Sequence, residues 1–155
     1  WKKNYVINPS FDEYGDRDAE IVDFAIVDSR DKYTSVLAKG DDFQIKIRIR
    51  ANRTVEEPIV AYTIKTLKGT DITGTNTMFE KYSLGTMNPG DEKTVTFTQK
   101  LDIQGGQYLM SFGCIRYENN DFKVFHRLYD IINLSIVSEK NTVGYYDMNS
   151  VIEVK

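Results

Sequence analysis

The sequence has one cysteine and one histidine in 155 residues, and each scarcity excludes a kind of site. Cys114 has no partner for a disulfide within the chain, which fits a reducing compartment and a fold held by its core alone. His126, as the single histidine, excludes metal sites that need two imidazoles and leaves Ser-His-Asp catalysis dependent on one residue. We therefore expect no metal and no cofactor.

Long apolar runs, an excess of positive charge and a phosphate-binding loop are also missing. No segment reaches the length of a membrane-spanning helix, which favours a water-soluble domain. The 20 Lys and Arg against 23 Asp and Glu give a net charge of −3, which makes nucleic acid an unfavourable partner. Without a Gly-rich loop followed by Lys-Ser or Lys-Thr, the chain is not expected to hydrolyse ATP. Because it opens at Trp1 without a signal-peptide pattern, we interpret it as a fragment of a longer cytoplasmic protein.

What the sequence does contain is a series of short segments rich in Val, Ile, Phe, Tyr and Thr, separated by turn residues. In the segment 43–50 apolar and polar residues alternate strictly, which predicts a strand with one buried and one solvated face. No segment carries an apolar stripe at helical spacing. We predict an all-β, antiparallel β-sandwich, immunoglobulin-like or jelly-roll-like, of about nine strands. They are expected near residues 19–28, 34–38, 42–51, 58–67, 70–77, 92–101, 106–117, 122–137 and 143–154.

The start of the chain lacks this alternation. Residues 1–17 mix aromatic, charged and turn residues without a period, so we predict a linker arm at 1–17 and one domain at 18–155. Inside the domain, bulky residues occupy every second position of the segment 107–114. Ser111 and Gly113 are two of the residues that alternate with them. The small residues predict a surface that a ligand can approach closely.

The order of several motifs resembles that of a known family over residues 15–137. The motifs are Ala19–Val22, Lys39–Phe43, Glu57-Pro58 ahead of a strand ending at Ile64–Gly69, Ile72–Thr77, Pro89–Glu92 and Gly106–Ser111. Gly-Thr-Asn-Thr at 74–77 is the most specific of them. Together they resemble the C-terminal carbohydrate-binding domain of Wzt-type ATPases, the ATP-binding subunits of ABC transporters that export O-antigen and related polysaccharides.

The resemblance implies a non-catalytic β-sandwich at 18–155 that follows an ATPase domain in the parent protein. Such a domain would recognise a surface polysaccharide, O-antigen or a similar glycan, at the cytoplasmic face of the membrane before export. Its partners would be this glycan, the upstream ATPase domain and the membrane transporter subunit. A homodimer is implied as well, because Wzt-type ATPases work in pairs.

Sugar recognition requires aromatic faces for the C–H patches of the ring and planar polar groups for its hydroxyls. Any single tyrosine in a strand is more often a packing residue, and Asn76 has a competing interpretation as a turn cap. Cys114 is expected to be a buried, inert thiol. The candidate carbohydrate-binding residues, on the small-residue face and its rim, are Thr63, Lys65, Asn76, Ser111, Arg116, Tyr117, His126 and Tyr129.

Two other functions stay open at this point. A small glycoside hydrolase or lyase would need two converging carboxylates, such as Asp130 and Glu118. A structural module would instead bury a protein partner on its sheets. The basic stripe Lys46, Arg48 and Arg50 could attract an anionic polymer, although charged outer faces are also the common way in which a sheet stays soluble.

The C-terminal tail, residues 141–155, carries a prediction about assembly. Asn141–Gly144 predicts a pliable joint ahead of a strand-like segment at 145–154. A terminal strand on a hinge can pair with its own sheet or with a neighbour's, and exchange between protomers is a low-cost route to a dimer. We expect a dimer in which the tail joins the edge of the partner's sheet, with an interface that includes Tyr145, Tyr146 and Met148.

Overall fold

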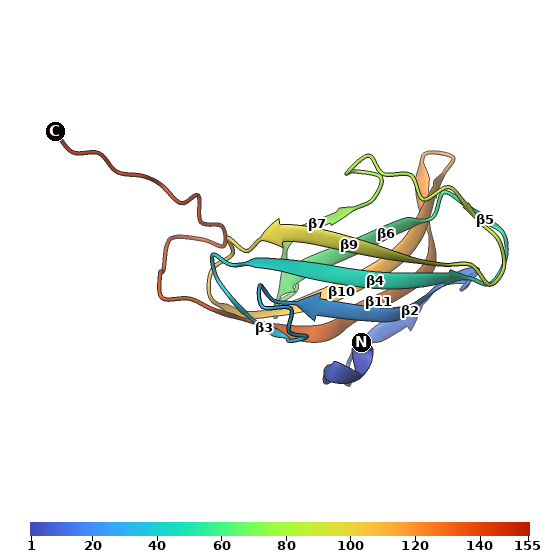
Figure 1. The fold of residues 1–155 in the computed structure, drawn as a ribbon, viewed down its shortest axis with the longest axis horizontal. Coiled ribbons are helices and arrows are strands. Elements are labelled where there is room, and N and C mark those ends of the chain that lie inside the picture. Colours follow the sequence, from blue (N-terminus) through green and yellow to red (C-terminus); the bar gives the residue numbers. More distant parts are fainter.

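Eleven strands and one short 3-10 turn make up the computed structural model, which describes residues 1–155 (Figure 1). The turn η1 spans Lys2–Asn4. The strands are β1 (Asp12–Tyr14), β2 (Ala19–Val27), β3 (Val36–Ala38), β4 (Asp42–Ala51), β5 (Val55–Glu56), β6 (Ile59–Thr66), β7 (Asp71–Asn76), β8 (Thr86–Met87), β9 (Glu92–Lys100), β10 (Gly106–Glu118) and β11 (Asp121–Val137).

The strands form two sheets that face each other. The larger sheet has the order β1-β11-β10-β6-β7, with β3 beside the end of β11, and the smaller sheet has the order β2-β4-β9. All pairs are antiparallel except that of β3 with β11, and β5 with β8 adds a small ribbon at one end (Figure 1). The prediction of an antiparallel β-sandwich is confirmed. The structure holds no helix with the length and apolar character that crossing a membrane requires.

The core lies between the sheets and follows the alternation in the sequence. Ile45, Ile47 and Ile49 of β4 are fully buried against the larger sheet, whose β10 contributes Met110 and Phe112. Burying side chains of this size stabilises the fold by roughly 1.5–3 kcal/mol each. Cys114 lies in the same layer, and burial raises the pKa of its thiol to about 12, which keeps the thiol protonated and unreactive.

Eight of the predicted strand positions agree with the structure to within about two residues, whereas the last one is wrong. Residues 143–154 form no strand within the chain, and their only ladder contact is an isolated bridge between Tyr146 and Ile103. Three very short strands, β1, β5 and β8, were not predicted. Such short strands are held by tertiary pairing and carry too few residues to show a period of two.

The N-terminal segment 1–17 lies against the sandwich at several points. Tyr5 is buried, and its hydroxyl donates a hydrogen bond to the carbonyl of Ile26 and accepts one from the N–H of Ile26 at 2.6 Å. Burial raises the pKa of this hydroxyl to about 12. Further along, the N–H of Asn8 donates to the carbonyl of Ile131, and β1 pairs with β11.

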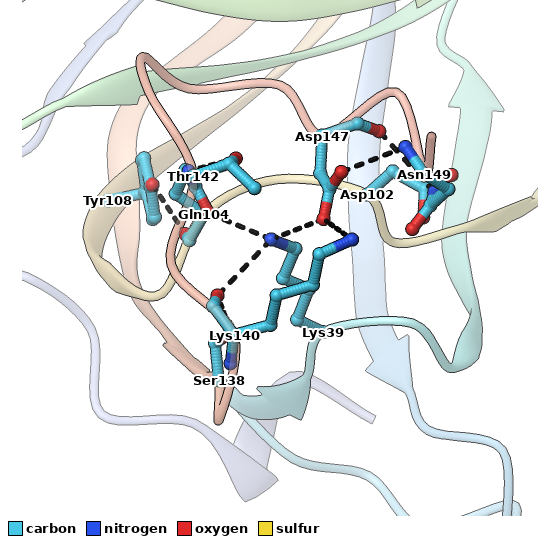
Figure 2. A network of polar contacts seen from close by, with 9 residues as sticks. All are labelled: Lys39, Asp102, Gln104, Tyr108, Ser138, Lys140, Thr142, Asp147 and Asn149. Atoms are coloured by element: carbon cyan, nitrogen blue, oxygen red, sulfur yellow. Dashed lines mark hydrogen bonds and ion pairs between the residues drawn. The ribbon is translucent and has the colours of Figure 1, made fainter. Parts of the chain in front are cut away.

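The root of the tail is fixed by a buried ionic cluster, which we call the tail clamp and define as Lys39, Gln104, Lys140 and Asp147 (Figure 2). The Asp147 carboxylate lies 2.9 Å from the Nζ atoms of both Lys39 and Lys140, and Lys39 also donates to Gln104 at 2.7 Å. These hydrogen-bonded ammonium groups hold the pKa of Asp147 well below its usual value. The carboxylate therefore stays charged and keeps its ion pairs across the neutral range.

Beyond the clamp the tail leaves the body of the domain. The N–H of Asp147 donates to the carbonyl of Asp102, and the Asn149 side chain donates to the Asp102 carboxylate at 3.0 Å. The pliable joint expected at Asn141–Gly144 is thus followed by an anchored stretch that ends at Asn149. After Asn149 the chain is highly exposed, as at Val151, Ile152 and Val154, and its C-terminal end extends away from the domain (Figure 1).

Replacing Tyr5 by phenylalanine should lower the free energy of unfolding by about 1–2 kcal/mol, because both polar backbone groups of Ile26 lose a buried partner. Urea denaturation followed by fluorescence measures this difference. Tyr82→Phe, at an exposed tyrosine, is the control and should leave stability unchanged. Equal stability of Tyr5→Phe and the unmodified chain would show that the hydrogen bonds of the Tyr5 hydroxyl do not stabilise the folded domain.

Candidate functional site

A hollow lies on the outer face of the larger sheet, the face turned away from the core. We call it the outer hollow. Its floor is made of small residues, because the register places Ser111 opposite Thr63 and Gly113 opposite Ala61. Long side chains rise around this floor and enclose a volume of about 100 Å³. The lining residues are Ala61, Tyr62, Thr63, Lys65, Asp71, Ser111, Phe112, Gly113, Arg127 and Tyr129.

A β-bulge in β11 shapes one wall of the outer hollow. The register between β10 and β11 shifts between Met110 and Phe112, and Asp130, in the bulge, has a φ of 58°. The bulge lets the N–H of Asp130 donate to the Ser111 hydroxyl at 2.8 Å. It also places the Asp130 carboxylate 2.8 Å from the Nζ of Lys65. Bulges commonly redirect side chains beside functional sites, and this one joins three strands in one polar network.

An aromatic and cationic platform forms the other wall. The rings of Tyr14 and Tyr129 are stacked, with centroids 6.4 Å apart and planes 24° apart. The Arg127 guanidinium lies 5.9 Å from each ring centroid and donates a hydrogen bond to the Tyr14 hydroxyl at 3.1 Å. Lys65 lies over Tyr129 at 4.8 Å. Contacts of this kind hold flexible side chains in place, so the platform is ordered before any ligand arrives.

The charged side chains in the outer hollow differ in how many polar partners they have. Lys65 and Asp130 form an ion pair, whereas Arg127 has only the Tyr14 hydroxyl as a polar partner. Asp71 contributes a second carboxylate on the opposite wall. A guanidinium and a carboxylate that line the same hollow can pair with neighbouring hydroxyls of a sugar ring. The exposed tyrosine faces can pack on the C–H side of the same ring.

The two carboxylates considered for a hydrolase do not converge. Glu118 lies opposite Asp121 at the tip of the β10–β11 hairpin, and Asp130 is nine residues further along β11. At the usual rise per residue this puts the two side chains roughly 30 Å apart. Glycoside hydrolysis by a carboxylate pair needs a separation of about 5–9.5 Å. The pair therefore cannot act on one glycosidic bond.

The outer hollow gathers four of the eight candidate residues: Thr63, Lys65, Ser111 and Tyr129. Sequence reasoning missed Arg127, Asp71 and Tyr14. Arg127 could have been predicted from the sequence, because it is two residues from Tyr129 and therefore lies on the same face of the strand. No sequence pattern around Tyr14 indicates a site residue, because its position beside Arg127 depends on the pairing of β1 with β11.

Asn76 and His126 are buried and lie outside the outer hollow. The Asn76 side chain accepts a hydrogen bond from the N–H of Phe79 at 2.8 Å, which is the turn-capping role considered for it. The Nδ1 of His126 accepts from the N–H of Ile21 at 2.9 Å, and its Nε2 lies 2.7 Å from the Glu13 carboxylate. His126 thus connects β11 with β2 and β1, and its bonds leave none of its ring nitrogens for a ligand.

Arg116 and Tyr117 lie at the hairpin end of the same sheet, away from the outer hollow. Arg116 pairs with Glu118 at 3.1 Å, and the Tyr117 ring packs on Phe122 with centroids 5.0 Å apart. The candidate set is therefore divided into four residues in the outer hollow, two at the hairpin tip and two that are buried elsewhere.

Comparisons with known proteins agree with this architecture. The family described as the Wzt C-terminal domain matches residues 10–148. A solved structure, the crystal structure of the C-terminal domain of Wzt, is similar with a TM-score of 0.90 and 22% identity, over 99% of this chain and 94% of that chain. A Niemann-Pick type C2 protein from the Japanese carpenter ant is similar at a TM-score of 0.54 and 8% identity, over 82% and 98% of the two chains. No curated protein sequence matches significantly.

His126→Ala should lower the free energy of unfolding by about 2–3 kcal/mol, since it opens a cavity and leaves the N–H of Ile21 without a partner. Chemical denaturation measures the loss. Lys123→Ala, an exposed position on the same strand, is the matched control. A stability equal to that of the control would mean that the buried hydrogen bonds of His126 do not hold β1 and β2 to β11.

Proposed function

The chain belongs to the Wzt C-terminal domain family, and on this premise we propose that it is the non-catalytic polysaccharide-binding domain of an ABC transporter ATP-binding subunit. The glycan is a cell-surface polysaccharide, O-antigen or one like it. Binding takes place at the cytoplasmic face of the membrane, before export. The upstream ATPase domain and the membrane transporter subunit are the protein partners.

The observation that carries this proposal is the platform of Tyr14, Arg127 and Tyr129 beside a floor of small residues. A pyranose ring is amphipathic, with C–H groups on its faces and hydroxyls around its edge. The tyrosine rings supply the apolar contact, and the Arg127 guanidinium supplies several hydrogen-bond donors in one plane. The floor at Ser111 and Gly113 lets the sugar approach the sheet closely.

The shallow shape of the outer hollow indicates weak binding. Few groups can be fully desolvated there, so we expect dissociation constants of about 10 µM to 1 mM. Affinity of this size suits a domain that must release a polymer for export. Avidity between two protomers can raise the effective affinity without any further contact.

Calorimetry with oligosaccharides from the surface polysaccharide of the source organism tests the site. Arg127→Ala and Tyr129→Ala should each weaken binding about tenfold or more, because each removes a side chain that contacts the sugar. Tyr33→Ala, an exposed tyrosine outside the outer hollow, is the control. Absence of binding by the folded chain, or unchanged affinity of both variants, would contradict the proposal. Release of reducing ends from the glycan would instead support the hydrolase alternative.

The assembly proposed for this domain is a homodimer formed by exchange of the projecting tail. Val151, Ile152 and Val154 are 96%, 83% and 87% exposed, which is unfavourable for three β-branched apolar residues unless another surface covers them. Ile152 and Val154 alternate with Glu153, a pattern that suits a strand pairing with a sheet edge. Tyr145, Tyr146 and Met148 are exposed at the tail root and would add contact area to the interface.

The sandwich offers a place for a partner's tail. β7 and β9 are the outermost strands of their sheets, so each leaves one edge unpaired. Between them lies a cleft of about 700 Å³, with Tyr62 and Phe97 among its apolar lining residues and several threonines around them. A strand in this cleft would cover the apolar lining and satisfy one of the free edges. We therefore assign the cleft between β7 and β9 as the receiving edge of the proposed dimer.

Light scattering on a chain that ends at Asn149 tests the exchange. This truncation keeps the tail clamp but removes the projecting segment, so the dimer should become a monomer. The double variant Ile152→Asp, Val154→Asp should give the same result, whereas Val143→Asp, an exposed position ahead of the projecting segment, should remain dimeric. A monomeric unmodified chain, or a truncated chain that stays dimeric, would rule out tail exchange as the cause of assembly.

A further inference from the structure

Three exposed aromatic rings gather at the end of the β10–β11 hairpin, in a cluster that we call the aromatic tip. Tyr117 and Phe122 face each other across the hairpin with ring centroids 5.0 Å apart. Phe79, from the segment after β7, packs edge-on against Phe122 at 6.5 Å and 89°. The exposed fractions of Phe79, Tyr117 and Phe122 are 62%, 48% and 39%. A contiguous patch of exposed aromatic side chains is typical of a surface that binds a partner or a ligand.

The aromatic tip continues the face that carries the outer hollow. Along β10, residues 111, 113, 115 and 117 point to the same side of the sheet, because side chains alternate along a strand. Ile115 is buried on this side together with Ile59, its partner in β6, and neither belongs to the core between the sheets. The two buried isoleucines lie between the outer hollow and the aromatic tip and form an apolar connection between them. From Gly113 to Tyr117 the distance along the strand is about 13 Å, which is more than one pyranose ring spans.

Charged side chains lie next to the aromatic tip on the opposite face of the hairpin, because Arg116, Glu118 and Lys123 alternate with the aromatic residues along their strands. The Glu118 carboxylate lies 3.1 Å from the Nε of Arg116 and 3.4 Å from the Nζ of Lys123. All three charged groups are partly exposed and can also bond with hydroxyls of a ligand. Three exposed rings form a surface that suits a sugar chain, whereas a stable protein partner would bury about 800 Å² on each side.

We propose that the aromatic tip is a second contact point for the glycan, so that the polymer lies lengthwise along β10 from the outer hollow to the hairpin. This inference rests on the proposed polysaccharide-binding function and adds to it. The ligand is then an oligosaccharide segment of several residues, and a single sugar fills only the outer hollow. Affinity should accordingly increase with the length of the glycan until both contact points are occupied.

Calorimetry with a disaccharide and a hexasaccharide, both cut from the surface polysaccharide of the source organism, tests this inference. Phe79→Ala and Tyr117→Ala should each weaken binding of the hexasaccharide about fivefold and leave binding of the disaccharide unchanged. Phe79→Trp should keep the affinity for the hexasaccharide, because it preserves the aromatic face. Tyr33→Ala removes an exposed tyrosine outside both contact points and the cleft, and it is the matched control. Thermal melting verifies that each variant is folded.

The outcomes separate the two proposals. If Tyr129→Ala weakens binding of both ligands while the tip variants weaken neither, the second contact point is refuted and the proposed function stands. Equal affinity of the unmodified chain for both ligands would refute the lengthwise arrangement in the same way. If the folded chain binds neither ligand, the proposed function itself fails, and the inference fails with it.

Discussion

The pairing of β10 with β11 is the interaction on which the rest of the structure depends. These two strands form the centre of the larger sheet: β1 and β3 pair with β11, β6 pairs with β10, and β7 is attached through β6. Their register places Gly113 beside Arg127, and its shift at the bulge places Asp130 beside Ser111. One strand pair thus supplies the core on one side and the candidate site on the other. A slip by one residue would exchange the two faces, since side chains alternate along a strand.

The inward and outward side chains of this strand pair have different roles: the inward ones stabilise the core, and the outward ones form the candidate site. Tyr108, Met110 and Phe112 point inward and pack against the smaller sheet, so substitutions there would affect folding. Ser111 and Gly113 alternate with these residues and point outward, and their small size creates the outer hollow without opening a cavity in the core. Recognition residues in such an arrangement can change while the fold is kept, which is useful for a binding domain whose ligands vary in chemistry.

The tail clamp adds a second constraint, which acts on assembly. Lys39 and Asp147 are both almost completely buried, and a buried charge is tolerated only when its partner is present. Removing the tail from residue 141 onward would leave Lys39 without that carboxylate, so the segment that reaches Asn149 belongs to the folded domain. The clamp fixes where the tail leaves the body, and the proposed exchange concerns only the six residues that follow Asn149.

The sequence by itself determined the fold class, most strand positions and the side of each strand that faces the core. These features follow from the alternation of apolar and polar residues over a few neighbouring positions, as at Phe43–Arg50. Only the tertiary structure decided which outward residues meet. Tyr14 reaches Arg127, and Glu13 reaches His126, across 113 residues of sequence. The direction of the tail was likewise decided by Lys39, far away in the chain. Strand alternation is a local property, whereas pairing and ion contacts join residues whose separation leaves no pattern in the sequence.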